Sequence, residues 1–221
     1  MAEPLRHPGP VLEQPAILVI TGLMAAGKST VAQSLAQRLP SAAHVRGDAF
    51  RRMIVSGRAE LTPPLSAAGR TQLNLRHRLA ALVADEYATA GITAVVQDVY
   101  LGDDLSHFLS LLRHRPIYLA VLAPRPNVIA RRERARGKTG YGQWSIAAFD
   151  TLLREQTPQL GLWVDNSDLS VEETVDAILS NLSGSARHAN VGREVDTHGA
   201  SRTQPGPVRR PRAAGARIPG C

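Results

Sequence analysis

The sequence predicts a three-layer α/β fold, in which a five-stranded parallel sheet is flanked by helices on both faces. Short apolar runs alternate five times along the chain with segments of helical periodicity, an order typical of parallel strands joined by crossover helices. In addition, a Gly-x4-Gly-Lys-Ser stretch between Gly22 and Ser29 joins the first apolar run to the first helical segment. That context predicts a phosphate-binding loop between a strand and a helix.

The first half of the chain contains three expected strands and two expected helices. The strands are short apolar runs at 16–21, 42–45 and 92–98, and the helices cover 28–39 and 73–91. The first helix places apolar side chains on one face and stops before a proline, which cannot continue a helix. The second is rich in Ala and Leu and closes at Gly91, a residue suited to the left-handed turn at a helix end.

The second half contains two more strand–helix pairs. The runs PIYLAVLA (116–123) and LGLWVD (160–165) predict strands, each followed by a helix, at 127–136 and 170–179. Asn127 is expected to cap the first of these helices. At the start of the last helix, Ser170 and Glu173 have the spacing of a capping box, which predicts two reciprocal hydrogen bonds there.

The charge distribution separates a folded body from its ends. We expect 1–15 to be a flexible lead-in, 16–182 the single folded domain, and 183–221 a disordered basic tail poor in large apolar residues. The tail holds seven Arg and two acidic residues, a net charge of +5, whereas residues 1–182 hold 19 basic and 17 acidic residues, a net charge of +2. The nearly neutral body argues against an extensive nucleic-acid-binding face.

Other bulk features predict a cytoplasmic protein. The longest strongly apolar run is too short to span a bilayer, and the first residues lack the pattern of a signal peptide. The single cysteine, Cys221, excludes an intrachain disulfide and fits a reducing compartment. The composition leaves the oligomeric state open.

The phosphate-binding loop predicts the use of ATP and Mg²⁺. We expect the nucleotide to contact Gly22, Leu23, Met24, Ala25, Ala26, Gly27, Lys28, Ser29 and Thr30. In this loop the lysine reaches the β- and γ-phosphates and the Ser29 hydroxyl binds Mg²⁺. Only two lysines, Lys28 and Lys138, stand against 24 arginines, which indicates a chemical role for a compact, mobile charge.

Asp48 is the predicted general base for transfer to a hydroxyl group. The Asn-Lys-x-Asp motif of switch GTPases is absent from the sequence, which favours a small-molecule kinase. Asp48 follows the second strand at the carboxyl edge of the sheet, where α/β proteins bind ligands, so it is expected to bind and deprotonate the acceptor. Alternatively, it caps a helix over 49–55. Arg51 is expected to hold Asp48 or to bind substrate.

Further charged residues are expected to complete the site. Asp98 ends the third strand and is expected to contact substrate or Mg²⁺, the alternative being a local ion pair. The stretch ARRERARGKTGYG (130–142) is a candidate lid, and one or two of its residues Arg132, Arg136 and Lys138 are expected to neutralise charge on the phosphates. Arginines at a helix end also have an ordinary role in complementing the helix dipole.

The region before and within the second helix is where we expect the acceptor to bind. The segment between 51 and 73 is irregular in pattern and lies where an acceptor could be clamped. Arg76 and His77 lie on the helix that follows. For His77 an ordinary packed or exposed position is the favoured interpretation.

Several stretches together resemble a known family. They are GLMAAGKSTVA, GDAFR, VVQDVYLG, VLAPR with RRERARGKTGYG, and TPQLGLWVDNSDLSVEETVDAIL. Over about 16–180 the chain resembles the small P-loop phosphotransferases of the chloramphenicol phosphotransferase-like family, whose wider relatives include gluconate, shikimate and adenylylsulfate kinases and zeta toxins. The resemblance implies a P-loop kinase-type fold with a lid, dependence on ATP and Mg²⁺, Asp48 as base, and Arg132 and Arg136 near the phosphates. Residues 57–72 and the helix after them depart from the chloramphenicol enzyme, which argues against chloramphenicol itself as the substrate.

The expected function is therefore transfer of the γ-phosphoryl group of ATP to a hydroxyl of a small molecule such as an antibiotic, a sugar or a nucleoside. One alternative is a zeta-toxin-like kinase acting on a nucleotide sugar. Another is a nucleotide-dependent regulatory module that binds nucleic acid through its basic tail. This last alternative predicts salt-sensitive binding that disappears when 183–221 is removed.

Overall fold

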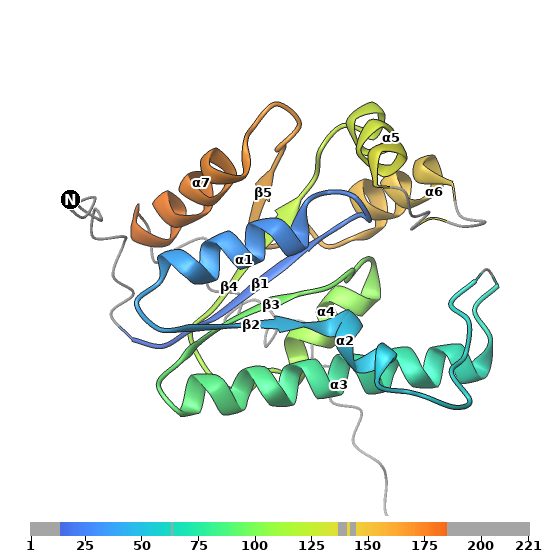
Figure 1. Ribbon diagram of the computed structural model, residues 1–221, viewed down its shortest axis with the longest axis horizontal. Coiled ribbons are helices and arrows are strands. Elements are labelled where there is room, and N and C mark those ends of the chain that lie inside the picture. Colours follow the sequence, from blue (N-terminus) through green and yellow to red (C-terminus); the bar gives the residue numbers. More distant parts are fainter. Residues whose placement is uncertain (1–13, 63, 137–140, 142–144, 185–221) are drawn as a thin grey trace, which may run out of the picture.

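The computed structural model describes residues 14–62, 64–136, 141 and 145–184, which contain one five-stranded sheet (Figure 1). All neighbouring strands are parallel, and their order is β2-β3-β1-β4-β5. The strands are β1 (Ile17–Gly22), β2 (Ala42–Arg46), β3 (Thr93–Gln97), β4 (Ile117–Leu122) and β5 (Leu162–Val164). This confirms the predicted fold class, a parallel sheet flanked by helices.

Helices cover both faces of the sheet and give it three layers. They are α1 (Lys28–Arg38), α2 (Gly47–Arg52), α3 (Ala67–Thr89), α4 (Asp103–Leu111), α5 (Pro126–Ala135), α6 (Ile146–Thr151), the π-helix η1 (Leu152–Gln156) and α7 (Val171–Gly184). In Figure 1, α1 and α7 lie on one side of the sheet and α3 and α4 on the other. No helix in the described part of the chain is long and apolar enough to cross a membrane.

The strand pattern explains why two apolar cores form. All six residues of β1 are buried, as expected for a central parallel strand covered on both faces. Because side chains alternate along a strand, Leu18 and Ile20 join the core beneath α1 and α7, while Ile17 and Val19 join the core that packs α3 and α4. The continuous apolar run that predicted β1 is thus the signature of a strand shared by two cores.

Gly22 is the last residue of β1 that pairs with β4, and the phosphate-binding loop begins directly after it. It pairs with Leu122 of β4 and has a φ of 140°. A Cβ atom at this position would lie 2.3 Å from the Leu122 carbonyl oxygen. Only glycine therefore lets β1 and β4 stay paired up to the point at which the chain turns into the loop.

Local signals in the second half are partly confirmed. The capping box of α7 is present: Glu173 N–H donates to Ser170 Oγ at 3.1 Å and Ser170 N–H donates to Glu173 Oε2 at 2.8 Å. The predicted cap at Asn127 is wrong, because Pro126 occupies the first turn of α5 and Arg125 is the N-cap. Proline is favoured at that position because its fixed φ suits the helix start.

The helix before the third strand is longer than predicted. It begins at Ala67 rather than 73, because the Ser66 side chain accepts a hydrogen bond from Gly69 N–H at 3.0 Å and so caps it. Residues 67–72, expected to be irregular, form its first turns. The helices α4, α6 and η1 were not predicted, since they fall in connections where the apolar pattern is too short to indicate a period.

Candidate active site

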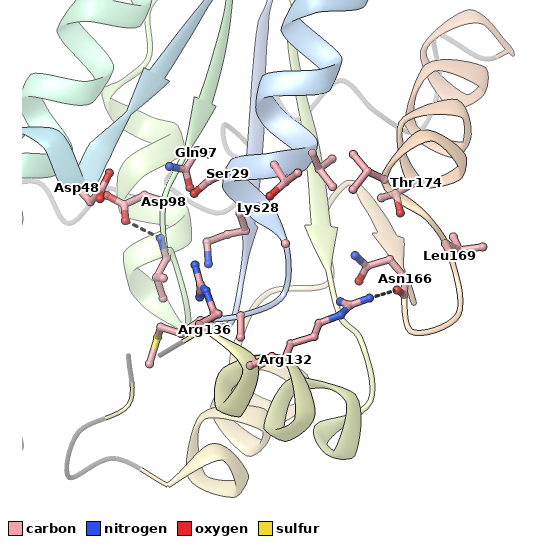
Figure 2. Close-up of a pocket in the computed structure, with 18 of the residues that line it drawn as sticks. Lys28, Ser29, Asp48, Gln97, Asp98, Arg132, Arg136, Asn166, Leu169 and Thr174 are labelled. Carbon is pink, nitrogen blue, oxygen red and sulfur yellow. Dashed lines mark hydrogen bonds between the residues drawn. The ribbon is translucent and has the colours of Figure 1, made fainter. Parts of the chain in front are cut away.

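A cavity of about 550 Å³ opens at the carboxyl edge of the sheet (Figure 2). Its walls come from the phosphate-binding loop and the start of α1, the start of α2, the end of β3, the end of α5 and the segment from β5 into α7. Chain segments far apart in sequence meet there because parallel strands direct their carboxyl ends to one edge. The volume lies in the usual range for small-molecule sites.

The loop between β1 and α1 has the conformation that an anion site requires. Ala25 has a φ of 61° and Gly27 a φ of 99°, so the backbone makes a tight turn around the cavity. Helix α1 begins at Lys28 after a glycine, which has no side chain to cap the first N–H groups. These N–H groups and the positive end of the helix dipole are suited to bind phosphate.

Lys28 is a buried cation at the centre of this cavity. Its Nζ donates to the Leu23 carbonyl oxygen at 2.8 Å, and only 8% of the residue is exposed. Burial lowers the pKa of Lys28 from 10.5 to about 8, an effect that nearby Asp98 opposes and that Arg136 reinforces. The ammonium group is therefore poorly solvated in the free protein, and a bound phosphate group would stabilise its charge.

Asp98 is held rigidly by an ion pair. It directly follows β3, is 3% exposed, and accepts hydrogen bonds from both Nε and Nη2 of Arg76 on α3. Its Oδ1 also accepts the Val99 N–H at 2.7 Å. A Cβ at Gly47 would lie 2.0 Å from Asp98 Oδ2, so the carboxylate packs directly against the backbone that precedes Asp48.

Asp48 lines the same cavity and is less constrained. Its Oδ2 lies 3.0 Å from Arg52, and its Oδ1 lies 3.9 Å from Arg46. Within the described residues, Oδ1 accepts no hydrogen bond. Asp48 lies in the first turn of α2, whose N-cap is Arg46, so the capping role considered for Asp48 is not observed. Figure 2 shows Asp48 and Asp98 side by side at one end of the cavity.

Two arginines at the end of α5, Arg132 within the helix and Arg136 directly after it, line the cavity on the opposite wall. Arg132 donates to the carbonyl oxygens of Asn166 at 2.9 Å and Ala26 at 3.4 Å. Asn166 Nδ2 also donates to Ala26 O at 3.0 Å. Arg136 lies beside Lys28 in Figure 2 and is 3.9 Å from Glu133. The arginines thus differ: Arg132 ties α5 to the loop, and Arg136 adds positive charge to the cavity.

The structure brings together most of the residues that the sequence singled out. The cavity is lined by Met24, Ala25, Gly27, Lys28, Ser29, Thr30, Asp48, Asp98, Arg132 and Arg136. Gly22, Leu23 and Ala26 do not line the cavity, but the carbonyl oxygens of Leu23 and Ala26 accept hydrogen bonds from Lys28 and Arg132.

Arg51 stands apart from this group, and part of the expected lid lies outside the described residues. The Arg51 guanidinium donates to the Ala59 carbonyl oxygen at 3.0 Å and lines no described cavity, so it ties down the segment after α2 and does not reach the site. Of the expected lid, 137–140 and 142 lie outside the described residues, and Lys138 is among them. Tyr141 is described, and its hydroxyl donates to the Met24 carbonyl oxygen at 2.9 Å.

Sequence reasoning missed two parts of the site. Arg76 was noted without a role, and no local signal could reveal a pair formed with a residue 22 positions away. The wall formed by Asn166, Ser170 and Thr174 was also missed. The polar DNSDLS stretch directly after the last strand was a usable signal, because strand ends of a parallel sheet gather at one edge.

The residues at the Asp48 end fit a magnesium ion that is bound together with a nucleotide. Ser29, Asp48, Gln97 and Asp98 all place oxygen-bearing side chains on the cavity wall. Among the described residues no group of three or more acidic, His or Cys side chains could hold a metal ion by itself. That donor set suits Mg²⁺, which usually takes one or two protein ligands and completes its shell with phosphates and water.

Comparison with known proteins places the chain in a family. The profile of a family described as an AAA domain matches residues 17–158, from β1 to just beyond η1. The match covers more than half of the 221 residues. The chain belongs to the AAA domain family. The matched segment of this AAA domain protein includes Lys28, Asp48 and Asp98, and it stops before the Asn166 wall.

Solved structures of kinases share the fold of this AAA domain protein. One is the Mycobacterium tuberculosis APS kinase CysC in complex with AMPPNP and APS, at 20% identity and TM-score 0.58, with 78% of this chain and 99% of that chain covered. Another is a Sinorhizobium meliloti 1021 gluconokinase, at 17% identity and TM-score 0.53, with 78% and 94% covered.

A third structure is the Deinococcus radiodurans tunicamycin resistance protein, at 18% identity and TM-score 0.55, with 77% and 96% covered. At these identities the likeness shows the fold alone, and it confirms the expected P-loop kinase-type architecture. A search of curated protein sequences gave no significant match.

Proposed function

We propose that this protein is an ATP- and Mg²⁺-dependent phosphotransferase that moves the γ-phosphoryl group to a hydroxyl of a small molecule. The observation that carries the proposal is the content of one cavity: a phosphate-binding loop with a buried lysine, and opposite it the Asp48 carboxylate, one oxygen of which accepts no hydrogen bond from the described residues. The first part suits a triphosphate, and the second suits an acceptor hydroxyl.

The residues that line the cavity favour one orientation of the bound nucleotide. The phosphates would lie on the loop and the N-terminus of α1, next to Lys28. The nucleoside would then extend toward Asn166 and Thr174, on the wall nearest Arg132 (Figure 2). This orientation places the γ-phosphate toward Asp48. Mg²⁺ would bind the Ser29 hydroxyl and reduce the charge on the phosphates.

Asp48 is a better candidate for the base than Asp98. Both oxygens of Asp98 accept hydrogen bonds from Arg76, so protonating Asp98 would disrupt a buried ion pair. Asp48 retains an unbonded Oδ1 and is partly exposed. The role that we assign to Asp98 is to orient the substrate or the water around Mg²⁺.

The transfer step requires one proton acceptor and local positive charge. The acceptor oxygen forms a bond to the γ-phosphorus as the bond from that phosphorus to the β,γ-bridging oxygen breaks. The hydroxyl proton passes to Asp48, and the products are ADP and a phosphate monoester. Lys28 and Arg136, which line the cavity together, would stabilise the negative charge that develops on the transferring group.

The Asp48→Asn substitution tests this assignment. We expect the variant to bind ATP as the wild type does, but to transfer phosphate about 10²–10⁴-fold more slowly, because the amide cannot accept the proton. Product formation would be followed with the best acceptor from a panel of hydroxylated metabolites and antibiotics. Asp176→Asn, at an exposed position on α7, is the matched control and should remain active. Normal transfer by Asp48→Asn would show that Asp48 is not the base.

A further inference from the structure

A second cavity of about 370 Å³ adjoins the first. It lies between the segment that precedes α3, α3 itself, the segment after β3, and the α6–η1 region. Met24, Arg76 and Val99 line both cavities. A molecule in the second cavity would therefore reach the phosphate-binding site at the point where Arg76 holds Asp98.

The lining of the second cavity is mainly apolar. Its apolar members are Met24, Leu61, Leu65, Leu73, Val99, Leu101, Phe149 and Leu152. They come from four separate parts of the chain, so the apolar surface is a product of the fold and not of one apolar segment. Such a surface favours a ligand that removes a matching apolar area from water.

The charged residues of this cavity already have partners. Arg70 Nη1 donates to Asp104 at 2.8 Å and 3.1 Å, and Arg76 pairs with Asp98. Among the described lining residues no other side chain is charged. An anionic ligand would find no unpaired cation here. It would have to break the buried Arg76–Asp98 pair, which is costly, or compete with Asp104 for Arg70, whose pair is partly exposed and therefore weaker.

We infer that the second cavity is the acceptor site and that it takes an uncharged hydroxyl compound with a largely apolar body. This inference rests on the proposed phosphotransferase function and narrows its substrate class. The apolar body would pack among Leu65, Leu73 and Phe149, and a hydroxyl would project past Met24 and Val99 toward Asp48. The Arg70–Asp104 pair would offer hydrogen bonds to neutral polar groups of the acceptor. Carboxylate- and phosphate-bearing acceptors should bind more weakly, because this lining offers them no unpaired cation.

Two small probes test the inference through binding alone. Benzyl alcohol has an aromatic ring and a hydroxyl, and mandelate adds a carboxylate to the same carbon. Both would be titrated into the full chain with methyl-labelled Leu and Met, observed by NMR. We expect benzyl alcohol to perturb the methyl signals of Leu73 and Leu101 and mandelate to bind at least about tenfold more weakly. Equal or tighter binding of mandelate, or no response of these methyl groups to benzyl alcohol, would overturn the inference.

A pair of variants on one helix ties the result to this cavity. Leu73→Asp places a charge in the apolar lining, whereas Leu82→Asp changes a residue of α3 that is 52% exposed and lines no described cavity. We expect the first to weaken benzyl alcohol binding about tenfold or more and the second to leave it unchanged. Both should bind a non-hydrolysable ATP analogue normally. Unchanged benzyl alcohol binding by Leu73→Asp would contradict the assignment.

The same measurements separate this inference from the proposed function. If the selectivity for the neutral probe holds but no acceptor is phosphorylated with ATP, the phosphotransferase proposal fails and the selectivity of the cavity stands. If ATP-dependent transfer is found only with anionic acceptors, the proposed function stands and the inference about the acceptor class fails.

Discussion

At the scale of the residue, the burial of Lys28 couples the protonation of its side chain to the binding of nucleotide. Burial lowers its pKa to about 8, so in the free protein its ammonium group loses its proton at a mildly alkaline pH. A bound triphosphate would raise the pKa again, because opposite charge favours the protonated form. Nucleotide binding should therefore take up a proton in the alkaline range.

This coupling predicts that nucleotide affinity falls as the pH rises above about 8. The limiting slope is about tenfold per pH unit, and below about pH 7 the affinity should be flat with respect to this group. Calorimetric titrations with a non-hydrolysable ATP analogue from pH 7 to about pH 9.5 would measure it. Lys28→Arg is the control, because arginine stays charged throughout this range. The same slope in that variant would assign the effect to another group.

At the residue level, a motif that fixes local geometry allowed specific roles to be predicted, whereas a residue whose partner is distant in the sequence received no role. Lys28 and Ser29 were identified because the loop motif itself specifies their roles. Arg76 received no role because its partner, Asp98, lies on another element. His77, interpreted as an ordinary packed side chain, is fully buried and contacts the rings of Tyr100 and Phe108.

At the scale of elements, α3 links the two cavities. Its first turns carry Arg70 and Leu73, which line the second cavity, and Arg76, which lines both. The helix begins where Ser66 accepts a hydrogen bond from Gly69 N–H. The Ser66 hydroxyl therefore stabilises the first turn of α3, from which Arg70 and Leu73 extend.

Ser66→Ala should lower the free energy of unfolding by about 1 kcal/mol, since it removes an N-cap hydrogen bond. Urea denaturation followed by circular dichroism would measure the loss. Ser66→Asp provides the matched control, because aspartate also accepts a hydrogen bond at the N-cap and should keep most of the stability. Equal losses in both variants would show that the hydroxyl acts through packing rather than capping.

At the scale of the whole molecule, most of the excess positive charge lies outside the part of the chain that forms the two cavities. The residues that line the two cavities all belong to the described part of the chain, whereas 185–221 holds all seven arginines of the basic tail. A kinase body that carries its own donor and acceptor sites has no need of the tail for chemistry. A nucleic-acid-binding module would need it for affinity.

Removing 185–221 distinguishes these functions. We expect the shortened protein to retain ATP affinity and turnover within about twofold, because no residue assigned to the site is lost. Any RNA binding by the full chain should weaken steeply with salt and disappear on truncation. A full-length variant with the seven tail arginines changed to Gln separates the effect of charge from that of length. Loss of turnover in the shortened protein would argue against an autonomous kinase body.

The sequence by itself determined the layered α/β fold, the nucleotide loop and the strand-end carboxylates Asp48 and Asp98. These features follow from local patterns: apolar runs of strand length, a glycine-rich turn before a helix, and acids placed directly after strands. The tertiary structure decided which of those groups face each other. It paired Asp98 with Arg76, left Asp48 with an unbonded oxygen, and assembled an apolar cavity from four separate segments. Such contacts depend on the order and packing of the strands and helices, which no short stretch of sequence specifies.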